Sequence, residues 1–207
     1  MGNGLEQVVY DSKAFEPNAV FFTYGAGVNK HKLASFELAL RDAGVSGCNL
    51  VHVSSIYPKG AKILPREEGL SYLRDGQILF SIDATLATRE PNQLIAASVG
   101  AAIPDDPQIK GFLSEHHAYG QTDEEAAEYS QYLAALMLGS LQGIDIGEPS
   151  DNKGKKEYEF PRSDGTTFKV KTRHVTQSAV GRKDRLWTTV VAVCGLLRLE
   201  ERLVDKK

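Results

Sequence analysis

Apolar residues along this chain follow two spacings, one typical of strands and one typical of helices. Residues 20–24 are rich in β-branched and aromatic side chains and predict a buried strand, after which Gly25 and Gly27 favour a tight turn. Between residues 32 and 43 apolar side chains recur every three or four positions, which predicts an amphipathic helix. Gly44 supplies the expected end of that helix.

The rest of the chain predicts further strands and one long helix. Thr122 and Glu125 form a capping-box signature, so a helix should run from there to about residue 141. Residues 143–156, rich in Gly, Asp and Lys, predict a solvated loop. Strands are expected at residues 49–54, 77–83, 94–103 (where an Ala-rich pattern also fits a helix), 111–119 and 187–199, with a hairpin formed by 158–160 and 166–175.

These elements predict an α/β fold, and 207 residues suit one domain, residues 1–207. The formal net charge is -3, with basic and acidic residues spread along the chain, so no nucleic-acid partner is expected. The start of the chain lacks the pattern of a secretory signal, and the apolar run 188–197 is shorter than the roughly 20 residues of a membrane helix. We therefore expect a cytoplasmic protein with no membrane partner. Cys48 and Cys194 lack metal-type spacing and receive no chemical role.

A serine pair, Ser54 and Ser55, stands where the predicted strand 49–54 meets a bend imposed by Pro58 and Gly60. Taken alone, such a pair indicates only a turn. A serine hydroxyl on a strained turn can nevertheless attack the preceding carbonyl, and elimination followed by hydrolysis then leaves a pyruvoyl ketone at the new N-terminus. That ketone can form an imine with an amino acid and accept the electrons released when carbon dioxide leaves.

The segment Asn49-Leu50-Val51-His52-Val53-Ser54-Ser55-Ile56-Tyr57-Pro58-Lys59-Gly60 resembles the processing site of pyruvoyl-dependent arginine decarboxylases. The resemblance continues in residues 33–45, 101–104 and 111–115 and covers most of residues 20–141. It implies self-cleavage into a β chain, residues 1–54, and an α chain, residues 55–207, whose covalent pyruvoyl cofactor comes from Ser55. It also implies conversion of L-arginine to agmatine and carbon dioxide, which would feed polyamine synthesis.

The resemblance assigns catalytic roles to three residues. Ser55 becomes the pyruvoyl group, and Asn49 would polarise the scissile carbonyl or hold the substrate. Glu115 would protonate the α-carbon of the substrate after carbon dioxide has left, for which its carboxyl must carry a proton at that moment.

Substrate-binding roles are likewise implied by the resemblance. Glu37, where the family pattern has Asp, would bind the substrate guanidinium, because carboxylates bind this planar group through two hydrogen bonds. Leu33 and Leu40 would form an apolar wall along the substrate methylenes, and Ser54 would lie beside the substrate.

The architecture implied by the resemblance is an αββα sandwich of mainly antiparallel sheets covered by helices. Its members assemble as trimers or dimers of trimers, with sites between subunits. The segment 143–175 is longer than in compact members, and it is expected to form a surface hairpin or an oligomer contact.

Two alternative functions stay open: the same chemistry on another amino acid, and an α/β assembly protein without catalysis. A dinucleotide site is not expected, because Lys30 stands where the third glycine of the motif after Gly25 and Gly27 would be. No metal site is expected either, since the adjacent His116 and His117 would point to opposite faces of a strand.

Overall fold

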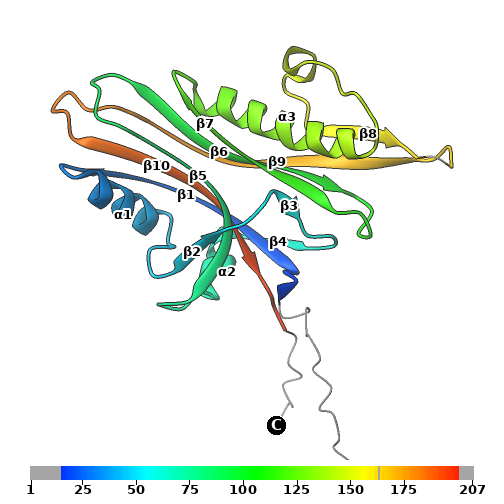
Figure 1. Ribbon diagram of the computed structural model, residues 1–207, viewed down its shortest axis with the longest axis horizontal. Coiled ribbons are helices and arrows are strands. Elements are labelled where there is room, and N and C mark those ends of the chain that lie inside the picture. Colours follow the sequence, from blue (N-terminus) through cyan, green and yellow to red (C-terminus); the bar gives the residue numbers. More distant parts are fainter. Residues whose placement is uncertain (1–14, 163, 201–207) are drawn as a thin grey trace, which may run out of the picture.

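The computed structural model describes residues 15–162 and 164–200, which form two packed five-stranded sheets with helices on their outer faces (Figure 1). The first sheet has the strand order β2-β5-β10-β1-β4 and the second β3-β7-β6-β9-β8. Only the pairs β1–β4 and β2–β5 are parallel among the described strands. The strands are β1 (Ala19–Asn29), β2 (Asn49–His52), β3 (Ile56–Tyr57), β4 (Lys62–Leu64), β5 (Ile78–Thr88), β6 (Leu94–Pro104), β7 (Gly111–Tyr119), β8 (Glu157–Pro161), β9 (Thr167–Val180) and β10 (Trp187–Leu197).

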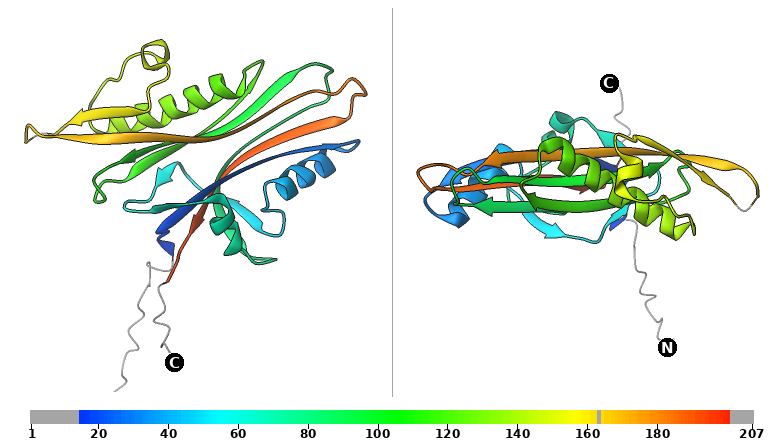
Figure 2. Two further views of the ribbon diagram at one scale, coloured as in Figure 1. Left: turned by 180° about the vertical axis from the view of Figure 1, so that it is seen from behind. Right: turned by 90° about the horizontal axis from the view of Figure 1, so that it is seen from above.

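Three apolar clusters define the four layers. The central cluster fills the space between the sheets and includes Ile82, Val99 and Leu113. A second cluster lies under the helices α1 (Lys32–Asp42) and α2 (Arg66–Ser71), and a third lies under α3 (Asp123–Leu141). Burial of apolar surface of this kind stabilises the folded state by about 25 cal/mol per Å² of area removed from water. The predicted αββα sandwich of mainly antiparallel sheets is confirmed, and Figure 2 shows its layers from behind and from above.

The ends of the two long helices are as the sequence predicts. At α1 the N–H of Gly44, whose φ is +79°, donates to Arg41 O, and the N–H of Val45 donates to Leu40 O. This pair of bonds is a Schellman motif and satisfies carbonyls that the helix leaves open. At α3 the Thr122 hydroxyl accepts from the Glu125 N–H while the Glu125 carboxylate accepts from the Thr122 N–H, which confirms the capping box.

The predicted turn at Gly25 and Gly27 is wrong, because β1 continues through both residues to Asn29. These glycines let α1 pack directly on the strand. A Cβ on Gly25 would lie 2.2 Å from Ala39 O, and a Cβ on Gly27 would lie 2.2 Å from Ser35 O. The missing side chains therefore set the distance between α1 and the sheet.

Gly27→Ala is expected to lower the free energy of unfolding by about 3 kcal/mol or more, because backbone atoms of α1 must move away. Gly120→Ala is the matched control: φ is +78° there but nothing lies within 4 Å of its Cβ, so only backbone strain is added, about 1 kcal/mol. Denaturant unfolding measures both variants. Equal losses in the two variants would contradict the packing explanation.

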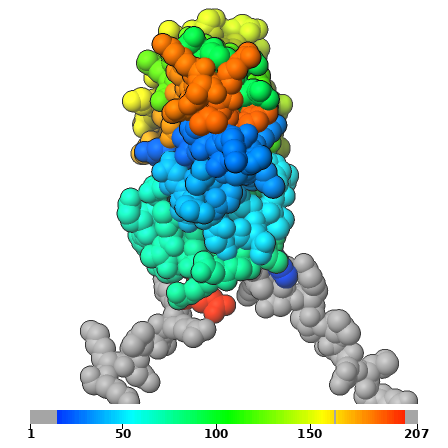
Figure 3. Space-filling model, turned by 90° about the vertical axis from the view of Figure 1, so that its left-hand side faces the viewer, coloured from blue at the N-terminus to red at the C-terminus, as the bar shows by residue number. Residues whose placement is uncertain are grey.

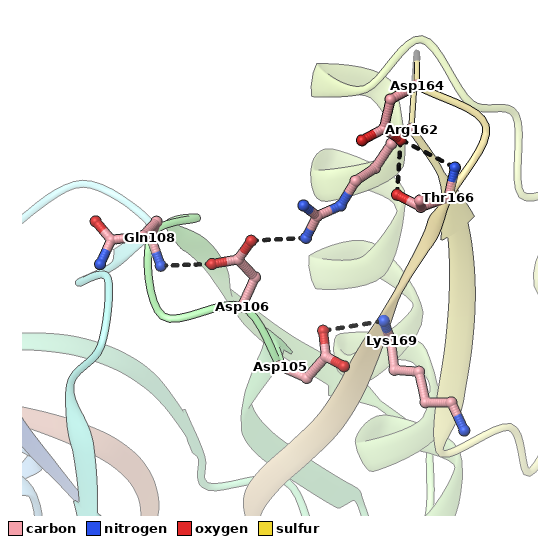
Figure 4. A network of polar contacts seen from close by, with 7 residues as sticks. All are labelled: Asp105, Asp106, Gln108, Arg162, Asp164, Thr166 and Lys169. Atoms are coloured by element: carbon pink, nitrogen blue, oxygen red, sulfur yellow. Dashed lines mark hydrogen bonds and ion pairs between the residues drawn. The ribbon is translucent and has the colours of Figure 1, made fainter.

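The expected hairpin is β8–β9, which projects beyond the rest of the sandwich (Figure 2). The turn end of this hairpin is tied to the turn after β6, as Figure 4 shows. Arg162 Nη2 lies 2.6 Å from Asp106 Oδ2, and the Lys169 N–H donates to Asp105 Oδ1. The Gln108 N–H and the Arg162 guanidinium hold the pKa of Asp106 below its usual range. Residue 163 of the predicted turn lies outside the described residues.

The segment 143–156 is more firmly anchored than the predicted solvated loop. It contains a short 3₁₀ helix, η2 (Pro149–Asn152), and its buried Asn152 donates to the carbonyls of Ile146 and Glu148. Ile144 and Ile146 pack against the cluster under α3. The short elements α2, β3 and β4 were not predicted. Among the described helices, none combines the length and apolar character needed to span a membrane.

Candidate active site

The serine pair lies where the chain crosses from one sheet to the other. Residues 53–55 leave β2 at an edge of the first sheet and enter β3 at an edge of the second. The Val53 N–H donates to Ser81 O at 3.0 Å, and the Leu113 N–H donates to Ser55 O at 2.8 Å. The crossing segment is therefore bonded to both sheets, which holds its backbone in place.

A tight turn centred on Ser55 places a hydrogen-bond donor on the carbonyl oxygen of the predicted scissile bond. The Ile56 N–H donates to Ser54 O at 2.8 Å, which spans two residues and is the hydrogen bond of a γ-turn. The φ of Ser55 is not positive, so the turn is the inverse form. A donor on this oxygen polarises the carbonyl carbon and would stabilise the negative charge that forms when a nucleophile attacks it.

The crossing segment borders a groove of about 680 Å³. Ser54 lines this groove together with the apolar side chains of Val53, Phe80 and Leu196. Lys59 and Lys110 also line it. Ser54 is exposed and Ser55 is half-buried, so a small molecule can reach the scissile bond from this side.

Glu115 lies close to the crossing segment on β7. It follows Leu113 by two residues, so both side chains point to the same face, and the Leu113 N–H already bonds Ser55 O. Two residues of strand span about 7 Å. Glu115 Oε2 is buried without a hydrogen-bond partner among the described residues. Because buried carboxylate oxygens are normally hydrogen-bonded, this atom is available to bond a molecule that enters the site.

His52 and Asp83, which the sequence did not single out, form a series of contacts that ends at Glu115. His52 Nε2 is 3.8 Å from Glu115 Oε1, and His52 Nδ1 is 3.5 Å from Asp83 Oδ1. The Ser81 hydroxyl donates to the same Asp83 oxygen at 2.9 Å. The one signal for His52 in the sequence is a titratable residue within an apolar strand, next to the serine pair.

Asn49 lies at the opposite end of β2 from the serine pair. Its side-chain Nδ2 donates to Gly76 O at 3.1 Å and not to the Ser54 carbonyl. Within one chain the structure therefore does not bring the Asn49 amide and the scissile bond together, and its role stays a prediction.

Three of the four predicted substrate-binding residues, Glu37, Leu33 and Leu40, lie on α1, away from the crossing segment that holds the fourth, Ser54. α1 packs on β1 and β10, whereas β2 lies two strand positions beyond β10, about 10 Å away. Glu37 forms an exposed ion pair with Arg41 at 2.8 Å. Leu33 is 78% exposed, whereas Leu40 packs toward the core. Figure 3 shows the end of the molecule where this part of the chain, in blue, is open to solvent.

The adjacent histidines of β7 have different surroundings. His116 Nε2 is bonded to Gln121 Oε1 at 2.8 Å, and His117 is exposed. Over residues 15–162 and 164–200 no group of three His, Cys, Asp or Glu side chains is arranged to hold a metal ion.

Comparison with known proteins shows to which family this chain belongs. The sequence model of the family described as pyruvoyl-dependent arginine decarboxylase matches residues 19–201. The chain belongs to this family. It is 48% identical over 183 residues to a probable pyruvoyl-dependent arginine decarboxylase of Chloroherpeton thalassium, covering 88% of this chain and 98% of the relative. It is 44% identical over 178 residues to the pyruvoyl-dependent arginine decarboxylase of Nitrosopumilus maritimus, covering 86% and 95%.

Membership in this decarboxylase family confirms the resemblance seen in the sequence, and a family of this kind has a covalently bound pyruvoyl group. The residues of the site fit such a group. Ser55 is the one residue of the crossing segment whose backbone turn places an N–H on the preceding carbonyl, and Glu115 Oε2, unpartnered within the described chain, lies nearby. Ser55 would hold the group, and Glu115 would face its substrate.

Proposed function

We propose that this chain cleaves itself between Ser54 and Ser55 and then decarboxylates L-arginine to agmatine. The observation that carries the proposal is the hydrogen bond from the Ile56 N–H to the Ser54 carbonyl, in a turn beside Glu115. Cleavage there yields the β chain of residues 1–54 and the α chain of residues 55–207. The cytoplasmic location and the lack of a nucleic-acid partner stay predictions.

Self-cleavage uses only this chain and one water molecule. The Ser55 hydroxyl attacks the Ser54 carbonyl carbon, the C–N bond breaks, and the peptide becomes an ester with a free Ser55 amine. Loss of the Ser55 α-proton then expels the Ser54 carboxylate and leaves a dehydroalanine residue. Water hydrolyses its imine tautomer and releases ammonia, which leaves a ketone at residue 55. The Ile56 N–H supports the first step because it bonds the oxygen that becomes negative.

The ketone supplies the electron sink for loss of carbon dioxide from the amino acid. Each turnover consumes one proton, because a carboxylate on the substrate α-carbon is replaced by hydrogen. We assign delivery of this proton to Glu115, whose buried Oε2 has no partner among the described residues. Positioned general acids of this kind contribute about 10²- to 10⁴-fold to rate.

Substrate recognition is assigned to α1 of a neighbouring subunit. Leu33 is exposed and the Glu37 side chain is 47% exposed, and both lie on a helix that packs two strand positions away from β2 of its own chain. A trimer, alone or paired as a dimer of trimers, would bring this surface over the serine pair of the next copy. The substrate guanidinium would then replace Arg41 as the partner of Glu37. Leu33 and Leu40 would contact the methylene chain of the substrate, and Ser54 would lie beside the substrate. Asn49 would polarise the scissile carbonyl or hold the substrate from the same interface.

Glu37→Ala is expected to raise KM for arginine about 10- to 100-fold, since a charge-assisted hydrogen bond contributes about 1.5–3 kcal/mol. Self-cleavage should be unchanged. Glu68→Ala, on the exposed face of α2, is the matched control and should behave like the wild type. Steady-state carbon dioxide release from arginine, lysine, ornithine, histidine and aspartate measures the effect. An unchanged KM for arginine in Glu37→Ala, or a preference for aspartate, would contradict the assignment.

Mixed assemblies test whether the site is shared between subunits. Glu37→Ala chains combined with Ser55→Ala chains should regain activity at about a quarter of the sites, where Ser55 comes from one chain and Glu37 from its neighbour. Mixtures no more active than the separate variants would place both residues in one subunit.

A further inference from the structure

We propose that His52, held by Asp83, is a positioning residue for Glu115 that directs the proton of this carboxyl to the substrate α-carbon. The inference rests on the proposed function and adds to it two residues to which the family resemblance assigns no role.

The contacts come from three strands that meet at the crossing segment. His52 is the last residue of β2, Asp83 belongs to β5 of the same sheet, and Glu115 belongs to β7 of the other sheet. His52 lies between the two carboxylates, 3.5 Å from Asp83 Oδ1 and 3.8 Å from Glu115 Oε1. Its ring is therefore the link between the carboxylates across the two sheets.

The donor and acceptor chemistry fixes what the ring does there. Both ring nitrogens face carboxylate oxygens: Nδ1 is within hydrogen-bond distance of Asp83 Oδ1, and Nε2 lies within ion-pair distance of Glu115 Oε1. Asp83 itself is held in place by the Ser81 hydroxyl. A ring fixed in this way lies against Glu115 Oε1, with Nε2 at 3.8 Å, and leaves the other oxygen, Oε2, which has no partner in the described chain, to carry the proton toward the substrate.

Positioning matters because two carbon atoms compete for the proton. Protonation of the substrate α-carbon gives the amine and restores the ketone. Protonation of the former ketone carbon instead leaves the amino nitrogen on residue 55 after hydrolysis, so that residue becomes alanyl and the substrate departs as an aldehyde and carbon dioxide. The ketone carbon is reduced and the substrate carbon is oxidised by the same electron pair, and no other oxidant or reductant is needed. Each such event inactivates one site.

The experiment compares His52→Gln and Asp83→Asn with the wild type and with His117→Gln. His117 is the matched control, because it is exposed and its side chain has no hydrogen bond or ion pair within the described part of the chain. Two quantities are measured on processed protein: kcat and KM for arginine, and the mass of the α chain after many turnovers. Alanyl in place of pyruvoyl adds about 1 Da.

His52→Gln and Asp83→Asn should each lower kcat about tenfold with KM nearly unchanged, and the alanyl form should accumulate severalfold faster per turnover than in the wild type. Loss of a residue that only supports the fold would not change the ratio of alanyl formation to normal turnover. An alanyl fraction and kcat equal to those of His117→Gln would overturn the proposal. If His52→Gln is not cleaved, the kcat and alanyl fraction of Asp83→Asn decide whether the proposal holds. Asp83 belongs to β5, which lies outside the crossing segment that must be cut. Failure of the wild type to release carbon dioxide from arginine would instead reject the proposed function.

Discussion

Ser55→Ala is expected to remain a single uncut chain without decarboxylase activity. Alanine keeps the backbone and the turn, in which the Ile56 N–H bonds Ser54 O, but removes the hydroxyl that residue 55 uses to attack that carbonyl. Without the attack no ester forms, and without the ester no ketone forms. Denaturing gel electrophoresis measures the cleavage, and carbon dioxide release from arginine measures the activity.

Ser54→Ala is the matched control for cleavage. The reaction uses only the main-chain carbonyl of residue 54, and the Ser54 side chain is exposed toward the groove, so this variant should still be cut. Full decarboxylase activity in Ser55→Ala would contradict the mechanism. Loss of cleavage in both variants, with the fold retained, would show that the serine pair acts together rather than through Ser55 alone.

Glu115→Gln is expected to be cleaved normally and to lose about 10²- to 10⁴-fold in kcat. The amide has nearly the same shape as the carboxyl but cannot deliver a proton. Ser55 keeps its bond from the Leu113 N–H, which comes from the backbone of β7 and not from the Glu115 side chain. Single-turnover measurement on the processed variant separates this chemical step from substrate binding.

Glu157→Gln serves as the matched control, because Glu157 is an exposed strand glutamate at the far edge of the second sheet. It should show the kcat of the wild type. A Glu115→Gln variant with wild-type kcat would remove Glu115 from proton delivery, and it would remove the role of His52 and Asp83 with it.

The fold was largely predictable where the signal is local. The capping box of Thr122 and Glu125 and the stop at Gly44 each depend on hydrogen bonds within a few residues, and the structure has both. The strand 94–103 required a choice between two patterns, and its burial between α3 and the central cluster explains why an Ala-rich segment forms a strand there.

Prediction failed where tertiary packing decides. Gly25 and Gly27 looked like turn residues because sequence pattern cannot show that a helix backbone will pack so closely that a Cβ would lie 2.2 Å from it. In the site, the serine pair was predicted because its motif is contiguous. The contact of His52 with Asp83 and Glu115 could not be predicted, because it joins three strands from both sheets.

Self-cleavage at Ser55 is tested without any variant by the mass of the purified wild-type chain after denaturation. We expect two fragments that meet at the Ser54–Ser55 bond, with the fragment of residues 55–207 lighter by one ammonia than simple hydrolysis gives. That fragment should also gain mass when it is treated with an amine and borohydride, which react with a ketone. One intact chain, or two fragments with an ordinary serine amine at residue 55, would contradict formation of the pyruvoyl group from Ser55.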